Sequence, residues 1–320
     1  MLMPRNLSTM SRREAFTHAA WVALLPGAII YALLDSTGYI AGGLVGADSH
    51  AYWVAARDAT SWYTEAPGQR DAYLYSPLFA QLLWPWAQLS WPMAQATWMA
   101  AQLAVLAWLV RPLGWWRGTA VALFVVVELV LGNVYIFLAA LLVLAVAGRG
   151  EALLGGLLTK VTPAVSGLWF VVRRDWVTVR RMAVVGAVVV GTSVLLAPGA
   201  WVDWLMFLAT QTGTGDGLLA LLRFSGAVVL VVVAAHRDRS VLLAPAMLLA
   251  NPMLGGWNVL ALLLCLPRLA MRDRRVRAEV EQPATAVLTL RLVRGRTVAI
   301  PFPLAARPAV AERAMHRRGA

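Results

Sequence analysis

Cysteine is nearly absent from this chain: Cys265 is the only one among 320 residues, and it lies in an apolar run. A disulfide framework is therefore excluded within the chain, and so is a metal site built from several cysteines. Histidine is scarce as well. The four histidines are scattered from His18 to His316, a distribution that does not suggest a metal cluster.

Charge is also scarce. Charged residues make up 14% of the sequence, whereas 60% are hydrophobic and the mean hydropathy is +0.67. An ordinary soluble domain is roughly 45–50% apolar and about 25% charged. The composition therefore predicts a polytopic membrane protein, which we expect to be all-α. Most of the formal net charge of +12 comes from the C-terminal segment, because residues 271–320 hold eleven arginines and four acidic residues. The basic excess thus belongs to a tail and does not indicate nucleic-acid binding.

Several motifs of soluble nucleotide chemistry are missing. The chain has no Asp-x-Asp pair, which nucleotide-sugar enzymes often use to hold a metal diphosphate. It has no Gly-rich phosphate loop of the Walker type and no Gly-x-Ser-x-Gly nucleophile elbow. We therefore do not expect chemistry driven by a soluble nucleotide.

Apolar runs predict about ten transmembrane helices, after a short N-terminus of residues 1–15. The first run is long enough to span and lacks a clear cleavage site, so we expect it to be retained. Several of the other runs are shorter than the roughly 20 residues of a straight crossing. An alternative is therefore that the two helix pairs that meet at Gly132 and at Pro252 are re-entrant or broken. The expected helices are 16–45, 78–89, 93–110, 119–131, 134–147, 152–172, 182–197, 218–235, 241–250 and 254–266.

Arginine clusters predict the orientation, since basic residues collect on the cytoplasmic side. With ten spans, residues 1–15, the clusters at 173–181 and 237–239, and the tail 269–320 fall together in the cytoplasm. The polar loops 46–77 and 198–217 then fall outside, and the catalytic domain is 16–268. Arg111 and Arg117 land on the outer side and disagree with this pattern. In the tail, residues 286–300 alternate like a hairpin, but a disordered basic tail near anionic membrane lipid is the favoured alternative.

The loop 46–77 is the only long polar interval in the first two-thirds of the chain. Two membrane helices need no more than about two to eight connecting residues, and long loops with mixed acids and aromatics are usually functional. Residues 48–58 are expected to form a short amphipathic helix, on which Asp48 and Tyr52 share a face because they are four residues apart. We interpret this segment as the active-site loop.

Ionisable residues inside membrane spans are costly and indicate function. Lys160 and Arg223 are both expected to reach a cavity beside Asp48, where two cations would suit a phosphate head group. The alternative is that they pair with Asp35 or with loop acids and fix helix packing. Glu128, nearer the inner side, is expected to be structural.

Four motifs in a fixed order resemble a known family. They are Asp48-x-x-x-Tyr52, Tyr73-x-Tyr75-x-Pro77, Gly132-Asn133, and Lys160-x-x-Pro163 closed by Arg173-Arg174. With these motifs, the chain resembles the bacterial polyprenol-phosphate-mannose-dependent α-mannosyltransferases of glycosyltransferase family 87, which have the GT-C membrane fold.

The resemblance implies a GT-C-like bundle with a long first extracytoplasmic loop in the inner (plasma) membrane. Asp48 would be the catalytic base, the donor a polyprenyl-phosphate sugar, and the acceptor a hydroxyl of a glycolipid or glycan. The reaction would invert the anomeric carbon without a metal or cofactor, and a cation would stabilise the leaving phosphate. The implied substrate-binding residues are Tyr52, Tyr73, Tyr75, Asn133, Lys160 and Arg223. For Tyr52 and Tyr75, sugar stacking and an interfacial aromatic belt remain alternatives.

The chain also departs from the family pattern. The family usually has Gly-Gln at the position of Gly132-Asn133, and it often has a histidine-containing segment near the last helices. Here Asn251-Pro252 is followed by Gly255-Gly256-Trp257-Asn258, without histidine. A lipid-linked-sugar transporter or an inactive scaffold on the same fold is therefore the alternative function.

Overall fold

The computed structural model describes residues 11–159, 162–211, 217–251, 257–281, 285–291 and 297–303. The chain divides into two compact units, residues 1–271 and 272–320, which are treated separately below. Lys160 and the segment 252–256 lie outside the described residues, so the predictions that depend on them are not addressed by the structure.

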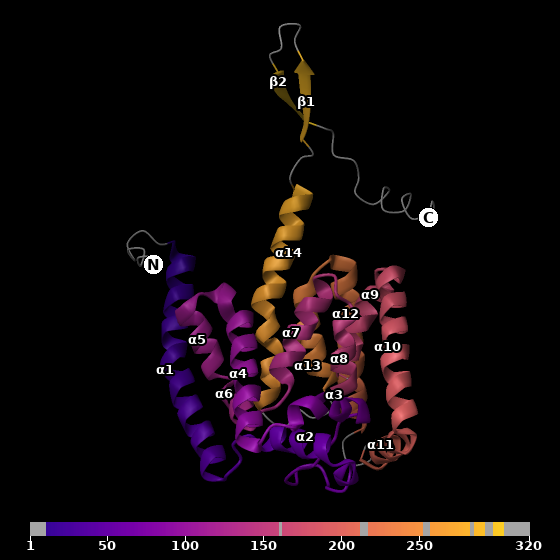
Figure 1. The fold of residues 1–320 in the computed structure, drawn as a ribbon. Coiled ribbons are helices and arrows are strands. Elements are labelled where there is room, and N and C mark those ends of the chain that lie inside the picture. The colour runs from indigo at the N-terminus through magenta and orange to yellow at the C-terminus, as the bar shows by residue number, and fades with distance from the viewer. Residues whose placement is uncertain are drawn as a thin grey trace. The chain divides into compact units, whose positions relative to one another are not determined.

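The first unit is a bundle of helices (Figure 1). Its centre is α7, whose Ile136 and Leu142 have no exposed surface. The helices are α1 (Arg12–Ala41), α2 (Ala47–Arg57), α3 (Pro77–Ala87), α4 (Trp91–Val110), α5 (Trp115–Leu123), α6 (Val126–Leu131), α7 (Tyr135–Val146), α8 (Ala152–Thr159), α9 (Leu168–Val172), α10 (Trp176–Leu196), α11 (Pro198–Gln211), α12 (Gly217–Arg237), α13 (Leu243–Ala250) and the start of α14 (Leu266–Glu281). Short 3₁₀ turns at 59–61, 111–113, 162–167, 240–242 and 257–265 connect or extend them.

Local sequence explains where the helices begin and end. Ser11 and Glu14 form a reciprocal capping box at the start of α1, which satisfies two backbone donors that the helix leaves open. Pro77 stands at the first position of α3, where a missing N–H costs nothing. Gly132 ends α6 in the left-handed region, at φ 74°, a conformation that glycine adopts without strain.

Four helices within the described residues are long and apolar enough to cross a membrane, judged by length and composition. They are Glu14–Ala41, Trp91–Leu113, Trp176–Leu196 and Gly217–Arg237. The helical, membrane-spanning class is thereby confirmed, whereas the expected count of about ten spans is not.

The predicted span 78–89 is wrong, because α3 lies along α2 instead of crossing. The C-terminal end of α3 is bound to α2: Arg57 donates to the carbonyl of Ala87 at 3.0 Å, and the Trp53 indole donates to the carbonyl of Leu89 at 3.0 Å. The rings of Tyr52 and Phe79 contact each other near the other end, at 5.3 Å between centroids. An 11-residue helix is only about 16 Å long, and this one is held along its length by another short helix.

The predicted span 152–172 is also wrong as a single crossing. It is divided into α8, a 3₁₀ turn and α9. A Cβ on Gly150 would meet Thr178 and Phe170, and Glu151 pairs with Arg181 at 3.9 Å. Both ends of the segment therefore lie beside the beginning of α10, so the chain enters and leaves the bundle at the same end.

Because α3 does not cross the bundle, Arg111 and Arg117 lie at the same end of the bundle as the other basic clusters. Gly46, after α1, lies against Trp91 at the start of α4 and donates to Val130 near the end of α6. The opposite ends of these helices therefore lie together, and they carry the arginines. Arg173 extends this set by pairing with Asp238, after α12, at 2.6 Å. The arginines at this end include Arg12, Arg111, Arg117, Arg149, Arg173, Arg181, Arg237 and Arg268, which donates to the carbonyl of Trp108 near the end of α4.

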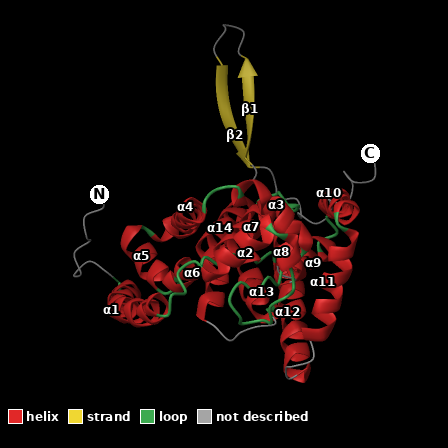
Figure 2. Cartoon of the chain, turned by 60° about the horizontal axis from the view of Figure 1, so that its bottom comes forward, coloured by secondary structure: helices red, strands yellow, loops and turns green. Residues whose placement is uncertain are grey.

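Residues 198–211, predicted as part of a polar loop, form the helix α11 instead. The rest of that loop, 212–216, lies outside the described residues. Figures 1 and 2 show α11 at the same end of the bundle as α2. The two regions meet where the Tyr63 ring stacks on Phe207, at 5.3 Å between centroids.

The second unit contains an antiparallel hairpin of β1 (Thr285–Arg291) and β2 (Thr297–Pro303), with Leu288 opposite Ile300. The favoured expectation of a disordered tail is therefore wrong for these residues.

Candidate functional site

Asp48 and Asn133 meet although they are 85 residues apart in sequence. The Asn133 side-chain amide donates to Asp48 Oδ2 at 2.6 Å. Asp48 is half-buried in the first turn of α2, where the positive end of the helix dipole stabilises a carboxylate. As predicted from sequence, residues near 48–58 form a short helix.

Two glycines allow α2 to approach the α6–α7 junction this closely. The N–H of Gly46 donates to the carbonyl of Val130 at 2.7 Å. A Cβ on Gly132 would lie 2.4 Å from Ser49 Oγ, and the φ of Gly132 is +74°. Both the contact and the left-handed backbone exclude a side chain at position 132.

Asn133 is itself held in place by neighbours. Its carbonyl accepts from Gln102 Nε2 at 2.7 Å, and its side-chain oxygen accepts from the N–H of Val134 at 2.7 Å. The Trp98 indole donates to the carbonyl of Gly132 at 2.8 Å. Because the Asn133 oxygen is engaged by the backbone, its amide nitrogen is directed to Asp48.

Glu128 stabilises the same junction between α6 and α7. It has no exposed surface, and its Oε1 accepts from the N–H of Tyr135 at 2.6 Å, at the beginning of α7. Its carbonyl accepts from the N–H groups of Gly132 and Asn133. Asn251 donates to the Tyr135 hydroxyl at 3.0 Å. Glu128 thus caps a helix, in agreement with a structural role. We call Asp48, Gln102, Glu128, Asn133 and Tyr135 the Asp48 cluster.

The predicted tyrosines are buried. Tyr52 and Tyr73 are 1% exposed and Tyr75 is 6% exposed. The Tyr52 and Tyr75 hydroxyls bond each other at 2.9 Å, and the Tyr73 hydroxyl donates to the carbonyl of Ser76 at 2.6 Å. None of these rings has a face open to a sugar in this conformation, so the structure favours a packing role.

Tyr52 nevertheless lies within the electrostatic reach of the cluster. Burial, together with Tyr75 and the carboxylates of Asp48 and Glu128, raises the pKa of Tyr52 well above its ordinary value. The phenol therefore stays protonated and keeps its hydrogen bond to Tyr75.

A second hydrogen-bonded pair, His50 and Asp71, lies on the other side of α2. His50 Nδ1 is 2.5 Å from Asp71 Oδ1, and the His50 ring meets Trp91 edge-on. Two residues along a helix are about 200° apart, so His50 and Asp48 point to different sides. The pair fastens residues 70–72 to α2, where Asp71 holds a left-handed backbone at φ 61°.

Arg223 lies in the second turn of α12 and is half-buried. Since α12 ends among the basic clusters, its beginning belongs to the half of the bundle that contains Asp48. The structure does not describe Lys160, so the predicted pair of cations cannot be assembled here.

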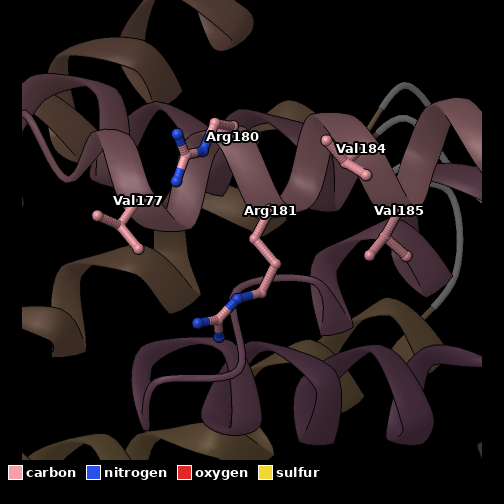
Figure 3. Close-up of a pocket in the computed structure, with 5 residues that line it drawn as sticks. All are labelled: Val177, Arg180, Arg181, Val184 and Val185. Carbon is pink, nitrogen blue, oxygen red and sulfur yellow. The ribbon is translucent and has the colours of Figure 1, made fainter.

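The hollows on the described surface of the bundle include one at the loop 46–77, which we call the Asp48 loop, and one on α10. The first, which we call the α11 hollow, has a volume of about 470 Å³ and lies between the Asp48 loop and α11. It is lined by Trp62, Tyr63, Thr64, Glu65, Ala66, Asp203, Met206, Phe207 and Thr210. The second, of about 280 Å³, lies on α10 between Arg180, Arg181 and three valines (Figure 3).

Sequence reasoning missed the residues that hold the site together. Gln102, Trp98 and Ser49 carry no motif, although a glutamine in the apolar helix α4 was a detectable signal, since polar groups in such helices need partners. Across the described ranges, no three His, Cys, Asp or Glu side chains are grouped to hold a metal ion.

Comparison with known proteins identifies the family. A model of glycosyltransferase family 87 matches residues 73–294, more than half of the chain. No curated protein and no solved structure matches. The matched range contains Tyr73, Asn133 and Arg223 but begins after Asp48. With its apolar helices and this match, the chain belongs to glycosyltransferase family 87 and is a membrane glycosyltransferase.

Proposed function

We propose that this protein transfers a sugar, mannose by resemblance, from a polyprenyl-phosphate donor to a hydroxyl of a glycolipid or glycan acceptor. The reaction inverts the anomeric carbon and requires no metal or cofactor. The observation that carries the proposal is the Asp48–Asn133 pair at 2.6 Å, on a junction that two glycines bring together.

Asp48 is the proposed general base. The acceptor hydroxyl loses its proton to the Asp48 carboxylate as its oxygen attacks the anomeric carbon, and the lipid phosphate leaves from the opposite face. One base is enough for a single inverting displacement. Asn133 occupies one oxygen, Oδ2, so its role is to orient the carboxylate towards the acceptor.

The leaving phosphate needs a cation, because negative charge grows on it in the transition state. Lys160 and Arg223 are the proposed contacts. The position of Arg223 in the Asp48 half of α12 supports this role. The alternative is that Lys160 or Arg223 pairs with an acidic side chain of the protein and fixes the packing of the helices.

The positions of the arginines support a proposal for the side of the membrane that the site faces. Arg111, Arg117, Arg173, Arg181 and Arg237 lie at the end of the bundle opposite Asp48, and basic residues collect in the cytoplasm. We therefore propose that the site faces the extracytoplasmic side. Labelling of a single cysteine at Ala66 from outside, in a Cys265→Ser background, tests it. Labelling at Ala66 only after lysis would overturn the orientation.

The function is tested with membranes that contain the full chain and radiolabelled polyprenyl-phosphate-mannose. We expect label to appear in a glycolipid or glycan, and to disappear with Asp48→Asn. If Asp48→Asn instead moves the intact lipid-linked sugar across the membrane as fast as the wild type, the protein is a transporter and the proposal fails.

A further inference from the structure

We propose that the α11 hollow binds the neutral glycan part of the acceptor. This inference rests on the proposed transfer reaction and specifies its acceptor side. The volume of about 470 Å³ falls within the range of small-molecule sites, roughly 300–1,000 Å³. The hollow joins two segments distant in sequence, the Asp48 loop and α11.

Aromatic rings form one part of the wall. Trp62, Tyr63 and Phe207 are half-buried, so each keeps part of its ring accessible. Tyr63 and Phe207 stack with their centroids 5.3 Å apart and form a continuous apolar surface. Such surfaces bind the C–H faces of sugar rings by the same contacts that pack aromatic residues.

Two carboxylates form the polar part of the wall. Glu65 and Asp203 are exposed, and within the described part of the chain neither side-chain carboxylate makes a hydrogen bond or an ion pair, although Asp203 interacts electrostatically with Tyr63. Ionised carboxylates only accept hydrogen bonds, so they match the hydroxyl donors of a sugar. Two negative charges repel a phosphate or another anion. The hollow is therefore suited to a neutral glycan and not to the donor's phosphate.

The aromatic wall is fixed relative to Asp48. The Trp62 indole donates to the carbonyl of Ala55 in α2 at 2.6 Å, and the Tyr63 hydroxyl donates to the carbonyl of Tyr75 at 2.8 Å. Ala55 follows Asp48 by seven residues, about 10 Å along the helix. A saccharide held in the hollow can thus extend along α2 and present its terminal hydroxyl to Asp48.

Direct binding of neutral oligosaccharides to the purified full chain in nanodiscs tests the proposal. Mannotriose and maltotriose are the probes, inorganic phosphate is the charged comparison, and affinity is measured by calorimetry. We expect Phe207→Ala and Asp203→Asn each to lower the affinity for the more tightly bound trisaccharide at least about tenfold, which corresponds to a loss of roughly 1.4 kcal/mol. Val202→Ala, also exposed on α11 but outside the hollow, is the matched control and should bind normally.

Asp48→Asn separates this inference from the transfer reaction, because it should abolish turnover but leave probe binding unchanged. If trisaccharide binding depends on Phe207 and Asp203 but no sugar transfer is detected, the proposed function is wrong and the glycan site is supported. Transfer by a wild-type protein that binds neither probe, or equal binding by wild type, Phe207→Ala and Asp203→Asn, would overturn the glycan site. Competition by phosphate would also overturn it.

Discussion

The Asp48 cluster and the α11 hollow differ in how their polar groups are bound. In the cluster, Asp48, Asn133 and Glu128 each bond to another segment of the chain. In the hollow, the side chains of Glu65 and Asp203 are exposed, and neither carboxylate makes a hydrogen bond or an ion pair with the described residues.

This difference matches two tasks. A reacting carboxylate has to be held in one geometry, because catalysis depends on preorganised groups. A surface that recognises a glycan must leave its acceptor atoms available to the ligand. Substitutions in the cluster should therefore act on turnover or folding, whereas those in the hollow should act on affinity.

The largest effect is expected for Asp48→Asn. Asparagine keeps the size of the side chain but cannot take a proton, and loss of a general base typically costs about 100- to 10,000-fold in rate. Transfer from radiolabelled donor measures turnover, while donor binding should persist. Asp58→Asn is the matched control and should be mild, because Asp58 is exposed and only caps a 3₁₀ turn, where its carboxylate accepts from the N–H and hydroxyl of Thr60. Turnover above about a tenth of wild type would place the base elsewhere.

The next largest effect, a loss of stability, is expected for Gly132→Ala. The new Cβ would meet Ser49 Oγ at 2.4 Å, and forced contacts of this kind cost about 1–3 kcal/mol, beyond about 1–2 kcal/mol for the left-handed backbone. Gly43→Ala has a similar φ, +70°, and open space around it, so it isolates the backbone term. Thermal unfolding of the two variants should differ clearly, and equal Tm values would contradict the close approach.

Asn133→Leu should lower turnover about 10- to 100-fold, because a hydrogen bond to a charged group contributes about 1.5–3 kcal/mol. Donor affinity should change much less than kcat, since in the proposed mechanism Asn133 contacts the general base, Asp48, and not the leaving phosphate. Asn133→Gln restores an amide and is the conservative comparison. Partial recovery by glutamine supports orientation of Asp48, whereas no loss with leucine would separate Asn133 from the reaction.

Tyr52→Phe should have the smallest effect, about 1 kcal/mol of stability from the lost bond to Tyr75. Its signature is the dependence on pH. The pKa of Tyr52 is raised on folding, so the associated stability is complete below about pH 10 and declines above it, as the unfolded chain releases its proton. Between pH 9 and 11.5 the Tm of the wild type should fall more steeply than that of the variant. Parallel curves would contradict the burial of this phenol.

The sequence predicted the class, the family and the short helix that carries Asp48, because hydropathy and spacing are local properties. It did not predict that α3 lies along α2. The run 78–89 is apolar enough to resemble a short span, and only its bonds to Trp53 and Arg57 show otherwise. The break between α8 and α9 lies in a segment that was predicted as one helix, although Lys160 and Pro163 interrupt its apolar residues.

The site was predicted in part for a similar reason. Asp48 and Asn133 each belong to a motif, and the structure brings them together. For Tyr52 and Tyr75, the sequence leaves sugar stacking and an interfacial aromatic belt as alternatives, because aromatic residues serve both recognition and packing and a single sequence does not show their burial. Gln102 and Ser49 act through contacts across more than 25 residues, which a single sequence does not reveal.

The arrangement of α2 and α3 has a consequence for how substrates would meet. These two helices lie at one end of the bundle rather than through it, so Asp48 stands at the level of helix ends. A donor whose prenyl tail stays in the hydrocarbon would carry its phosphate at that same depth. The donor would then approach sideways within the plane of the bilayer, and its surface density, not its bulk concentration, would set how often the enzyme is loaded.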